Sequence, residues 1–298
     1  MNMVSCAATT TALLTDYGEL YTFGRGGDGR LGVGDARNRW EPTRVKFPAS
    51  STHGEIKCMS VSTGANHSAV VTEDGGVYTF GRGNHGQLGL GDALSRLSPE
   101  RVELEGRVKI AACGHRHTLA VVHVDRSCNS ITEREHMEVK NATEREEVTF
   151  SNMRAEVWAW GSREFMGLQD RGGEEGEAGG GEFHGGAESE CMNAYKPVRL
   201  ECFNGLSITV VACGHAHSVA VTAGGVLWTW GLGLDGRLGH GDTRNALSPR
   251  AVRASSFRGG IVMAACGSAH TASIDDEGRL YTWGANSSGA LGIGNIAC

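Results

Sequence analysis

The sequence has little proline and no long apolar run. Only 5 of the 298 residues are proline, beside 45 glycines, which is about twice the usual glycine share of ~7%. The glycines follow no Gly-X-Y period, so the chain is not collagen-like. The longest apolar runs, such as residues 261–266, are far shorter than the ~20 residues that span a bilayer. The N-terminus has no basic segment followed by an apolar one. We therefore expect neither a membrane partner nor a secretory signal.

The sequence also lacks an excess of basic residues. Its formal net charge is -6, and residues 170–190 hold seven acidic residues against one arginine, so the rest of the chain is close to neutral. Non-specific binding to nucleic acid depends on lysines and arginines that neutralise phosphates. We therefore expect no direct nucleic-acid partner.

The sequence does contain a glycine-rich unit of roughly fifty residues, present five times. The clearest copy runs from 61 to 102, and the copy that begins at residue 4 aligns to it without a gap. From the position of His67 to that of Phe80 is 13 residues, and four copies share this spacing. In the third copy the same distance is 43 residues, which indicates an insertion of 30 residues. A second insertion follows before the fourth copy.

Each copy carries four strand signals. A short apolar run ends before a glycine, and a second strand begins at the histidine position and leads to a glycine-containing turn such as 74–76, a signal for a tight hairpin. The third strand ends in an aromatic residue and a glycine. The fourth begins with proline, as in 99–102, where the missing N–H costs least. Four short antiparallel strands repeated in this way are typical of a propeller blade.

The sequence therefore predicts an all-β fold, a β-propeller of four-stranded antiparallel blades with five repeats. One four-stranded sheet cannot bury both faces, so we expect the aromatic residues Phe23, Phe80, Trp160, Trp230 and Trp283 to pack between neighbouring blades. The repeat positions to which we assign a structural role are Gly64, His67, Gly81, Gly114, His117, Gly214, His217, Gly267, His270, Trp160, Trp230 and Trp283.

The cysteines favour reduced thiols. There are nine, an odd number, and none forms a Cys-x-x-Cys pair. Four of them, Cys6, Cys113, Cys213 and Cys266, occupy one repeat position that Thr63 fills in the remaining copy. A position that accepts Cys or Thr indicates a small buried residue. Reduced thiols place the protein in the cytoplasm or the nucleus.

The repeat resembles that of the regulator of chromosome condensation family. Residues 113–118 (Cys-Gly-His-Arg-His-Thr) and 280–284 (Leu-Tyr-Thr-Trp-Gly) match its pattern closely, and the resemblance covers nearly all of the chain outside the two insertions. The family forms seven-bladed propellers, whereas this sequence has five copies, the last without its fourth strand. A truncated gene model, a fragment or a five-bladed ring would each explain this. We expect a propeller that is incomplete relative to a seven-bladed ring.

The insertions set the expected organisation along the chain. Residues 1–124 hold repeats 1 and 2 and the start of repeat 3, and 125–155 are a charged insertion within repeat 3. Residues 156–168 complete that repeat. Residues 169–192 are an acidic glycine-rich insertion that we expect to be disordered, and 193–298 hold repeats 4 and 5, the last one truncated.

Two motifs suggest ligands but have simpler interpretations. Segments 24–29, 81–86 and 231–236 fit Gly-x-Gly-x-x-Gly, yet glycines follow too densely for the helix that a dinucleotide site needs, which indicates inter-strand loops. The pairs His115/His117 and His215/His217 resemble metal ligands. However, His117 and His217 share one repeat position in different blades, where we expect each to hydrogen-bond its own loop. We expect no metal and no cofactor.

No converging set of acids, bases or nucleophiles is present, so we expect no enzyme. We expect a monomeric protein-interaction scaffold that binds a protein partner through loops on one propeller face. The candidate contact residues occupy the Gly-x-x-His loops: Asn66, His115, Arg116 and His215. The resemblance to the family's founding member implies an alternative, a guanine-nucleotide exchange factor for a small GTPase, which needs no catalytic motif.

The family that this repeat resembles includes a plant ultraviolet photoreceptor, which is marked by tryptophans in the Gly-x-x-His loop. This sequence has Ala65, His115, His215 and Ser268 at those positions. We therefore do not expect a photoreceptor.

Overall fold

The computed structural model describes residues 2–48, 55–125, 153–166 and 193–294. Their strands form five antiparallel sheets in chain order, and each sheet follows the simple up-and-down order of its strands. The first sheet contains β1 (Met3–Cys6), β2 (Thr10–Leu14), β3 (Leu20–Gly24) and β4 (Arg39–Arg44). The second contains β5 (Cys58–Thr63), β6 (His67–Thr72), β7 (Val77–Gly81) and β8 (Arg96–Arg101). The third contains β9 (Arg107–Cys113), β10 (His117–Asp125), β11 (Met153–Gly161) and β12 (Ala194–Arg199). The fourth contains β13 (Ile208–Cys213), β14 (His217–Thr222), β15 (Leu227–Gly231) and β16 (Ala246–Ala251). The fifth contains β17 (Ile261–Cys266), β18 (His270–Asp275) and β19 (Leu280–Gly284).

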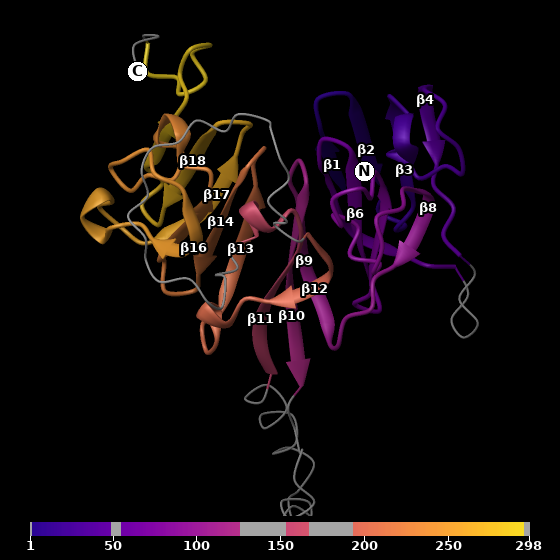
Figure 1. Ribbon diagram of the computed structural model, residues 1–298, viewed down its shortest axis with the longest axis horizontal. Helices are drawn as coiled ribbons and strands as arrows, with labels where there is room; N and C mark the ends of the chain where they lie inside the picture. The colour runs from indigo at the N-terminus through magenta and orange to yellow at the C-terminus, as the bar shows by residue number, and fades with distance from the viewer. Residues whose placement is uncertain (1, 49–54, 126–152, 167–192, 295–298) are drawn as a thin grey trace, which may run out of the picture.

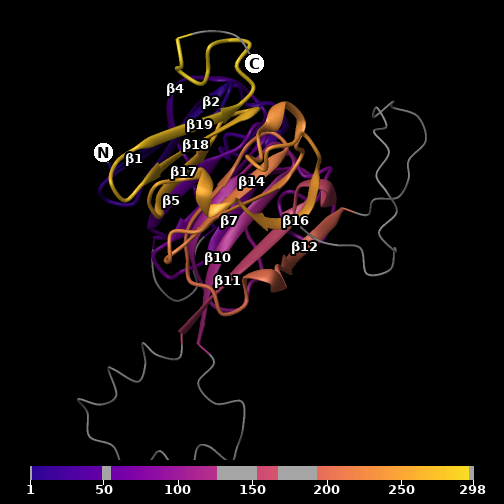
Figure 2. The ribbon, with the colours of Figure 1, turned by 90° about the vertical axis from the view of Figure 1, so that its left-hand side faces the viewer.

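These five sheets confirm the predicted β-propeller, and we call them blades 1 to 5. Figure 1 shows them following one another from indigo to yellow, and Figure 2 views them from the side of blade 5. The described residues contain five short 3₁₀ turns and no α-helix: η1 (Gly27–Gly29), η2 (Arg163–Phe165), η3 (Glu201–Phe203), η4 (Leu234–Gly236) and η5 (Ala254–Ser256). No helix in this part of the chain is long and apolar enough to cross a membrane. The Gly-x-Gly-x-x-Gly segments are inter-strand loops, as predicted.

The hydrophobic core lies between blades rather than within them. Each of four clusters of buried apolar residues joins two consecutive blades, as where Leu20 of blade 1 meets Phe80 of blade 2. The aromatic side chains Phe80, Trp160 and Trp230 are fully buried there, as predicted. The Trp160 indole N–H also donates to the Gln87 carbonyl of the preceding blade at 2.8 Å. Burying one such ring contributes about 3 kcal/mol or more.

A β-bulge directs these aromatic residues into the contact between blades. In blades 1 to 4 the pairing of the third strand with the fourth shifts register at the aromatic position, for example between Thr79 and Gly81. A bulge of this kind bends the strand and re-aims a side chain. In blades 2 to 4 the aromatic residue therefore points toward the preceding blade, whose loop covers it.

The outer sides of the first and last blades are more exposed than the middle of the molecule. At the position where the third strand begins, Leu20 and Val77 are at most 1% exposed, because the following blade covers them. Leu280 occupies the same position in blade 5 and is 66% exposed. Phe23 in blade 1 and Trp283 in blade 5 are only half-buried. Burial in this fold thus depends on the neighbouring blade.

Antiparallel strands place the connecting loops on two opposite faces. The loop between the first and second strands of a blade and the loop between its third and fourth strands open on the same side. We call this side the loop face, and it carries residues 64–66, 82–95, 114–116, 214–216 and 232–245. The long hairpin of β10 and β11, which extends downward in Figure 1, leads to the other side.

Both predicted insertions fall largely outside the described residues. Strands β10 and β11 flank residues 126–152, so the described chain stops within the predicted charged insertion 125–155. The predicted acidic insertion 169–192 also lies outside the described residues.

Candidate functional site

The Gly-x-x-His loops are held by a repeated pair of backbone hydrogen bonds. The glycine N–H donates to the carbonyl of the histidine, as from Gly114 to His117 at 2.9 Å. The carbonyl just before the histidine accepts from the loop after the third strand, as from Ser162 N–H to Arg116 at 2.8 Å. The same two bonds recur around Asn66 and Ala216. The two loops of each blade are thereby fixed to each other, which orients the side chains between the glycine and the histidine.

The repeated histidines form a buried layer beneath the loop face. His67, His117 and His217 are 0% exposed. Their Nε2 atoms lie 2.8 Å from Thr118 Oγ1, 2.8 Å from Ser218 Oγ and 3.0 Å from Thr271 Oγ1, in each case on the next blade. The expectation that these histidines bond their own loops is therefore wrong for their side chains. The first residue of the second strand points across the contact between blades, where the neighbour supplies the hydroxyl.

The hydroxyl groups fix the tautomer of these histidines. The hydroxyls of Thr118, Ser218 and Thr271 donate to backbone carbonyls at 2.8, 3.2 and 2.8 Å. Each hydroxyl must then accept from the histidine, so Nε2 carries the proton and Nδ1 carries none. Burial lowers the pKa of His67, His117 and His217 to about 3, which keeps them neutral at pH 7.

The loop glycines make room for this layer. A Cβ on Gly214 would lie 2.3 Å from His217 Cε1 and 2.7 Å from the Gly267 carbonyl oxygen. Gly114 is as closely confined by His117. Consecutive loops also touch through their backbones, since His215 N–H donates to the Ser268 carbonyl at 3.2 Å. The structural role predicted for these glycines thus has a steric basis.

A cavity of about 260 Å³ opens at the centre of the loop face, and residues from all five blades line it. Cys113, Cys213 and Cys266 are part of the lining. Burial raises the pKa of the Cys113 thiol to about 12, so it is not a ready nucleophile. Within the described residues, no group of three histidine, cysteine, aspartate or glutamate side chains is placed to hold a metal ion.

At the rim of this cavity, His115 and His215 stack on each other. Their ring centroids are 4.1 Å apart and the planes meet at 21°. Burial lowers the pKa of His115 to about 4, and His215 and Arg116 add to this effect. Burial also lowers the pKa of His215, with a contribution from Arg116. The rings therefore stack as neutral imidazoles.

The structure brings three of the four predicted contact residues together and places the fourth in the loop of the preceding blade. His115, exposed Arg116 and His215 form one group. Asn66 is half-buried, and its carbonyl accepts from the Arg82 N–H at 2.9 Å. Sequence reasoning missed Arg82 and His85, although antiparallel strand order alone puts their loop on the same face.

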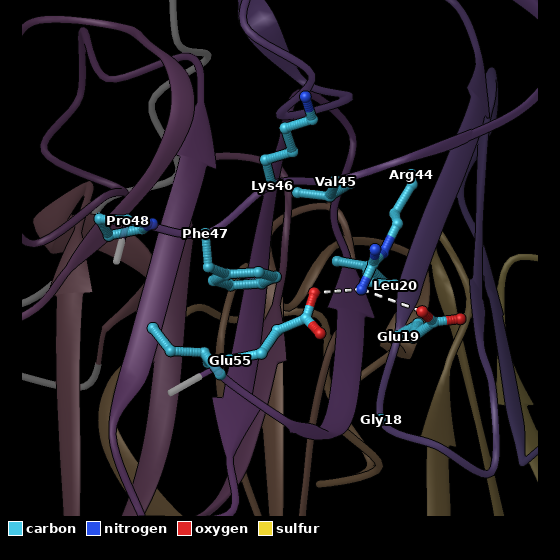
Figure 3. Close-up of a pocket in the computed structure, with 10 residues that line it drawn as sticks. Gly18, Glu19, Leu20, Arg44, Val45, Lys46, Phe47, Pro48 and Glu55 are labelled. Atoms are coloured by element: carbon cyan, nitrogen blue, oxygen red, sulfur yellow. Dashed lines mark hydrogen bonds and ion pairs between the residues drawn. The ribbon is translucent and has the colours of Figure 1, made fainter. Parts of the chain in front are cut away.

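A larger hollow of about 480 Å³ lies elsewhere, beside blade 1 (Figure 3). Arg44 points into it and is held between Glu19, at 2.9 Å, and Glu55. The charge of this arginine is thus already neutralised by two carboxylates. The exposed Lys46 is the other basic side chain among the residues that line the hollow.

Comparison with known proteins agrees with this repeat. The sequence model described as the regulator of chromosome condensation (RCC1) repeat matches residues 17–71, 74–121 and 224–274. A second model of the same repeat matches 60–87 and 263–290. The chain belongs to the RCC1 repeat family.

Relatives within the family are longer than this chain. It is 31% identical over 297 residues to the ultraviolet-B receptor UVR8 of Arabidopsis thaliana, which covers 98% of the chain and 55% of that protein. It is 32% identical over 283 residues to the E3 ubiquitin-protein ligase HERC2 of Homo sapiens, which covers 94% of the chain and 5% of that protein. The chain thus spans about half of one relative and a small part of the other.

Solved structures show the same fold. Prp20p of Saccharomyces cerevisiae, whose binding properties to Gsp1p and histones are described with its structure, superposes with a TM-score of 0.69 at 21% identity, covering 98% of this chain and 60% of that one. Human WBSCR16 superposes with a TM-score of 0.66 at 22% identity, covering 92% of this chain and 57% of that one. These likenesses support the RCC1-type propeller architecture.

Proposed function

We propose that this chain is a protein-interaction scaffold that holds a protein partner on its loop face, over the stacked pair His115 and His215. The observation that carries the proposal is that pair together with the exposed Arg116, which forms no ion pair within the described residues. Arginine is enriched at interface hot spots, and side chains held on a rigid surface lose less entropy on binding. Binding of this kind requires no catalytic group.

The buried layer below supports this assignment. The side chains of His67, His117 and His217 form hydrogen bonds between neighbouring blades. The side chains of His115, Arg116 and His215 on the loop face are therefore not needed to join the blades. The loop positions carry Ala65, His115, His215 and Ser268 and no tryptophan, so we do not extend light reception to this chain. We place the protein in the cytoplasm or nucleus, because all six described cysteines are free.

Guanine-nucleotide exchange on a small GTPase is the second candidate function. The observation that favours it is the likeness to Prp20p, which is described with its binding to Gsp1p, a small GTPase. Exchange would use the same loops to displace nucleotide and magnesium contacts. A nucleotide-release assay against a small GTPase separates the two functions, since a scaffold leaves the release rate unchanged.

The test of the scaffold compares pull-downs with the wild type, Arg116→Ala and a matched control. Arg253→Ala serves as the control, because Arg253 is exposed, has no ion pair among the described residues and follows β16 on the opposite face. We expect Arg116→Ala to weaken capture of a protein partner while Arg253→Ala does not. Equal capture by all three proteins would refute the loop face as the binding surface.

A further inference from the structure

Five basic side chains gather on the loop face from three consecutive blades. Arg82 and His85 come from blade 2, His115 and Arg116 from blade 3, and His215 from blade 4, and we call them the basic cluster. His115 lies within the electrostatic reach of the other four. His85 is influenced by both arginines of the cluster. The cluster is therefore one site built from several blades.

No carboxylate is among the described charged groups that act most strongly on these histidines. His115 faces His215, Arg116, His85 and Arg82. His215 faces Arg116 of the neighbouring loop and Arg237 of its own blade. Beneath them lies the buried histidine layer, which is neutral. The charged groups that act most strongly on the histidines of the cluster are thus arginines and other imidazoles.

Two other arginines of the loop face are already paired with aspartates. Arg30 pairs with Asp28 at 3.2 Å, and Arg237 pairs with Asp235 at 2.9 Å. Arg82 and Arg116 form no ion pair within the described part of the chain, although the whole chain has a net charge of -6. Two unpaired cations beside three histidines are a strong local departure from the overall charge, and an anion is the group that complements them.

We propose that the basic cluster binds an acidic peptide segment of the protein partner, with carboxylates held by Arg82 and Arg116 and hydrogen-bonded by His115 and His215. This inference rests on the proposed scaffold function and names the chemistry of its partner. Side-chain carboxylates fit the forked donors of arginine. The adjoining cavity of about 260 Å³ offers space for one peptide side chain. A nucleic acid would need a continuous basic track, and the chain outside residues 170–190 is close to neutral.

Binding of such a segment is coupled to proton uptake. In the free protein His115 and His215 have pKa values below the ordinary value of 6.5, and a bound carboxylate raises them. The complex therefore binds more protons than the free protein does. Affinity must then increase as the pH falls from 7.5 toward 5.5.

The experiment uses the full chain and a fluorescent octaglutamate peptide, with octaglutamine as the uncharged control, measured by fluorescence polarisation at pH 7.5 and pH 5.5. We expect octaglutamate to bind, with affinity higher at pH 5.5, and octaglutamine not to bind. Arg82→Gln and Arg116→Gln should each weaken binding about five- to tenfold, and Arg253→Gln less than about twofold. The double variant His115→Gln/His215→Gln should lose most of the pH dependence. Melting temperatures of all variants confirm that they are folded.

Three outcomes overturn this inference. Equal loss in Arg253→Gln and Arg116→Gln would show non-specific attraction. Tighter, Arg116-dependent binding of a phosphoserine peptide or of single-stranded DNA with the same number of charges would assign the cluster to phosphate. Absence of octaglutamate binding while partner capture still requires Arg116 would refute the acidic partner and leave the scaffold function standing. Partner capture unchanged in Arg116→Ala would instead refute the scaffold function, so the two failures are distinct.

Discussion

Two histidine positions in the same loops, only two residues apart, have opposite environments. His117 and His217 are fully buried and reach a hydroxyl on the next blade, whereas His115 and His215 stack at the rim of the central cavity. The first pair joins blades, and the second pair lies where a partner can reach it. Within each of these Gly-x-x-His loops, the final histidine thus joins neighbouring blades, and the residue two positions before it is available to a partner. The two tasks are divided by position within the loop and not between blades.

The largest expected effect that tests this contrast is the pH dependence of the free energy of unfolding. His67, His117 and His217 have pKa values of about 3 in the folded chain, against an ordinary value of 6.5. Between pH 6.5 and pH 3 the unfolded chain binds more protons, so their stabilising contribution is complete above pH 6.5 and is lost as the pH falls. At pH 5 we expect a loss of about 2 kcal/mol for each of the three. Chemical denaturation at pH 7 and pH 5 measures it.

The control for this experiment is a variant that lacks one buried histidine. His117→Gln should reduce the difference in stability between pH 7 and pH 5, whereas Gly224→Ala, which removes no titratable group, should leave it unchanged. Lowered carboxylate pKa values, such as that of Asp92, affect stability only at lower pH, so they do not interfere. A pH slope that is the same in both variants and the wild type would contradict the assignment.

A second test fills the space that the buried layer requires. Gly214→Ala places a Cβ against the His217 ring and the Gly267 carbonyl oxygen, so the ring or the next loop must move. We expect a loss of about 2 to 4 kcal/mol, measured by chemical denaturation. Gly224→Ala in the same blade is the matched control, because its Cβ would meet only Thr222 Oγ1, at 3.8 Å. Equal effects of the two substitutions would show that the contact between loops is loose.

A third test removes one member of the buried layer. His117→Ala deletes the hydrogen bond to Ser218 and leaves a cavity between blades 3 and 4. We expect a loss of about 2 to 3 kcal/mol at pH 7. The melting temperature measures it, with His123→Ala as the control, because His123 is only half-buried on the same strand. A loss below that of the control would mean that the hydroxyl finds another partner at no cost.

The sequence predicted the blades well because the pattern of the first three strands occurs five times and that of the fourth strand four times. The positions of Phe80, Trp160 and Trp230 followed from this register, since packing between blades is the only way to bury them. The hydrogen bond from His67 to Thr118 did not follow from the register of the repeat, because it joins two different copies. The recurrence of Ser or Thr directly after each histidine was the available signal, and reading one copy at a time concealed it.

The candidate site was only partly predictable for a related reason. One repeat position identified His115 and His215 as equivalent, but equivalence does not reveal that their rings are 4.1 Å apart. That distance depends on how tightly successive loops approach one another at the centre, which the confined Gly114 and Gly214 determine. Arg82 was absent from the prediction because its loop was considered only as a dinucleotide motif.

The smallest expected effect concerns the stability of the exposed pair. His115→Ala and His215→Ala each remove a stacking contact at the rim but no hydrogen bond between blades. Each ring lies among cations and its partner is also unprotonated, so the pair contributes little beyond contact between the rings. We expect a change within about 0.5 kcal/mol, measured at pH 7 beside His117→Ala. If His115→Ala were as destabilising as His117→Ala, the rim would be part of the framework, and its histidines could not be free to serve a partner.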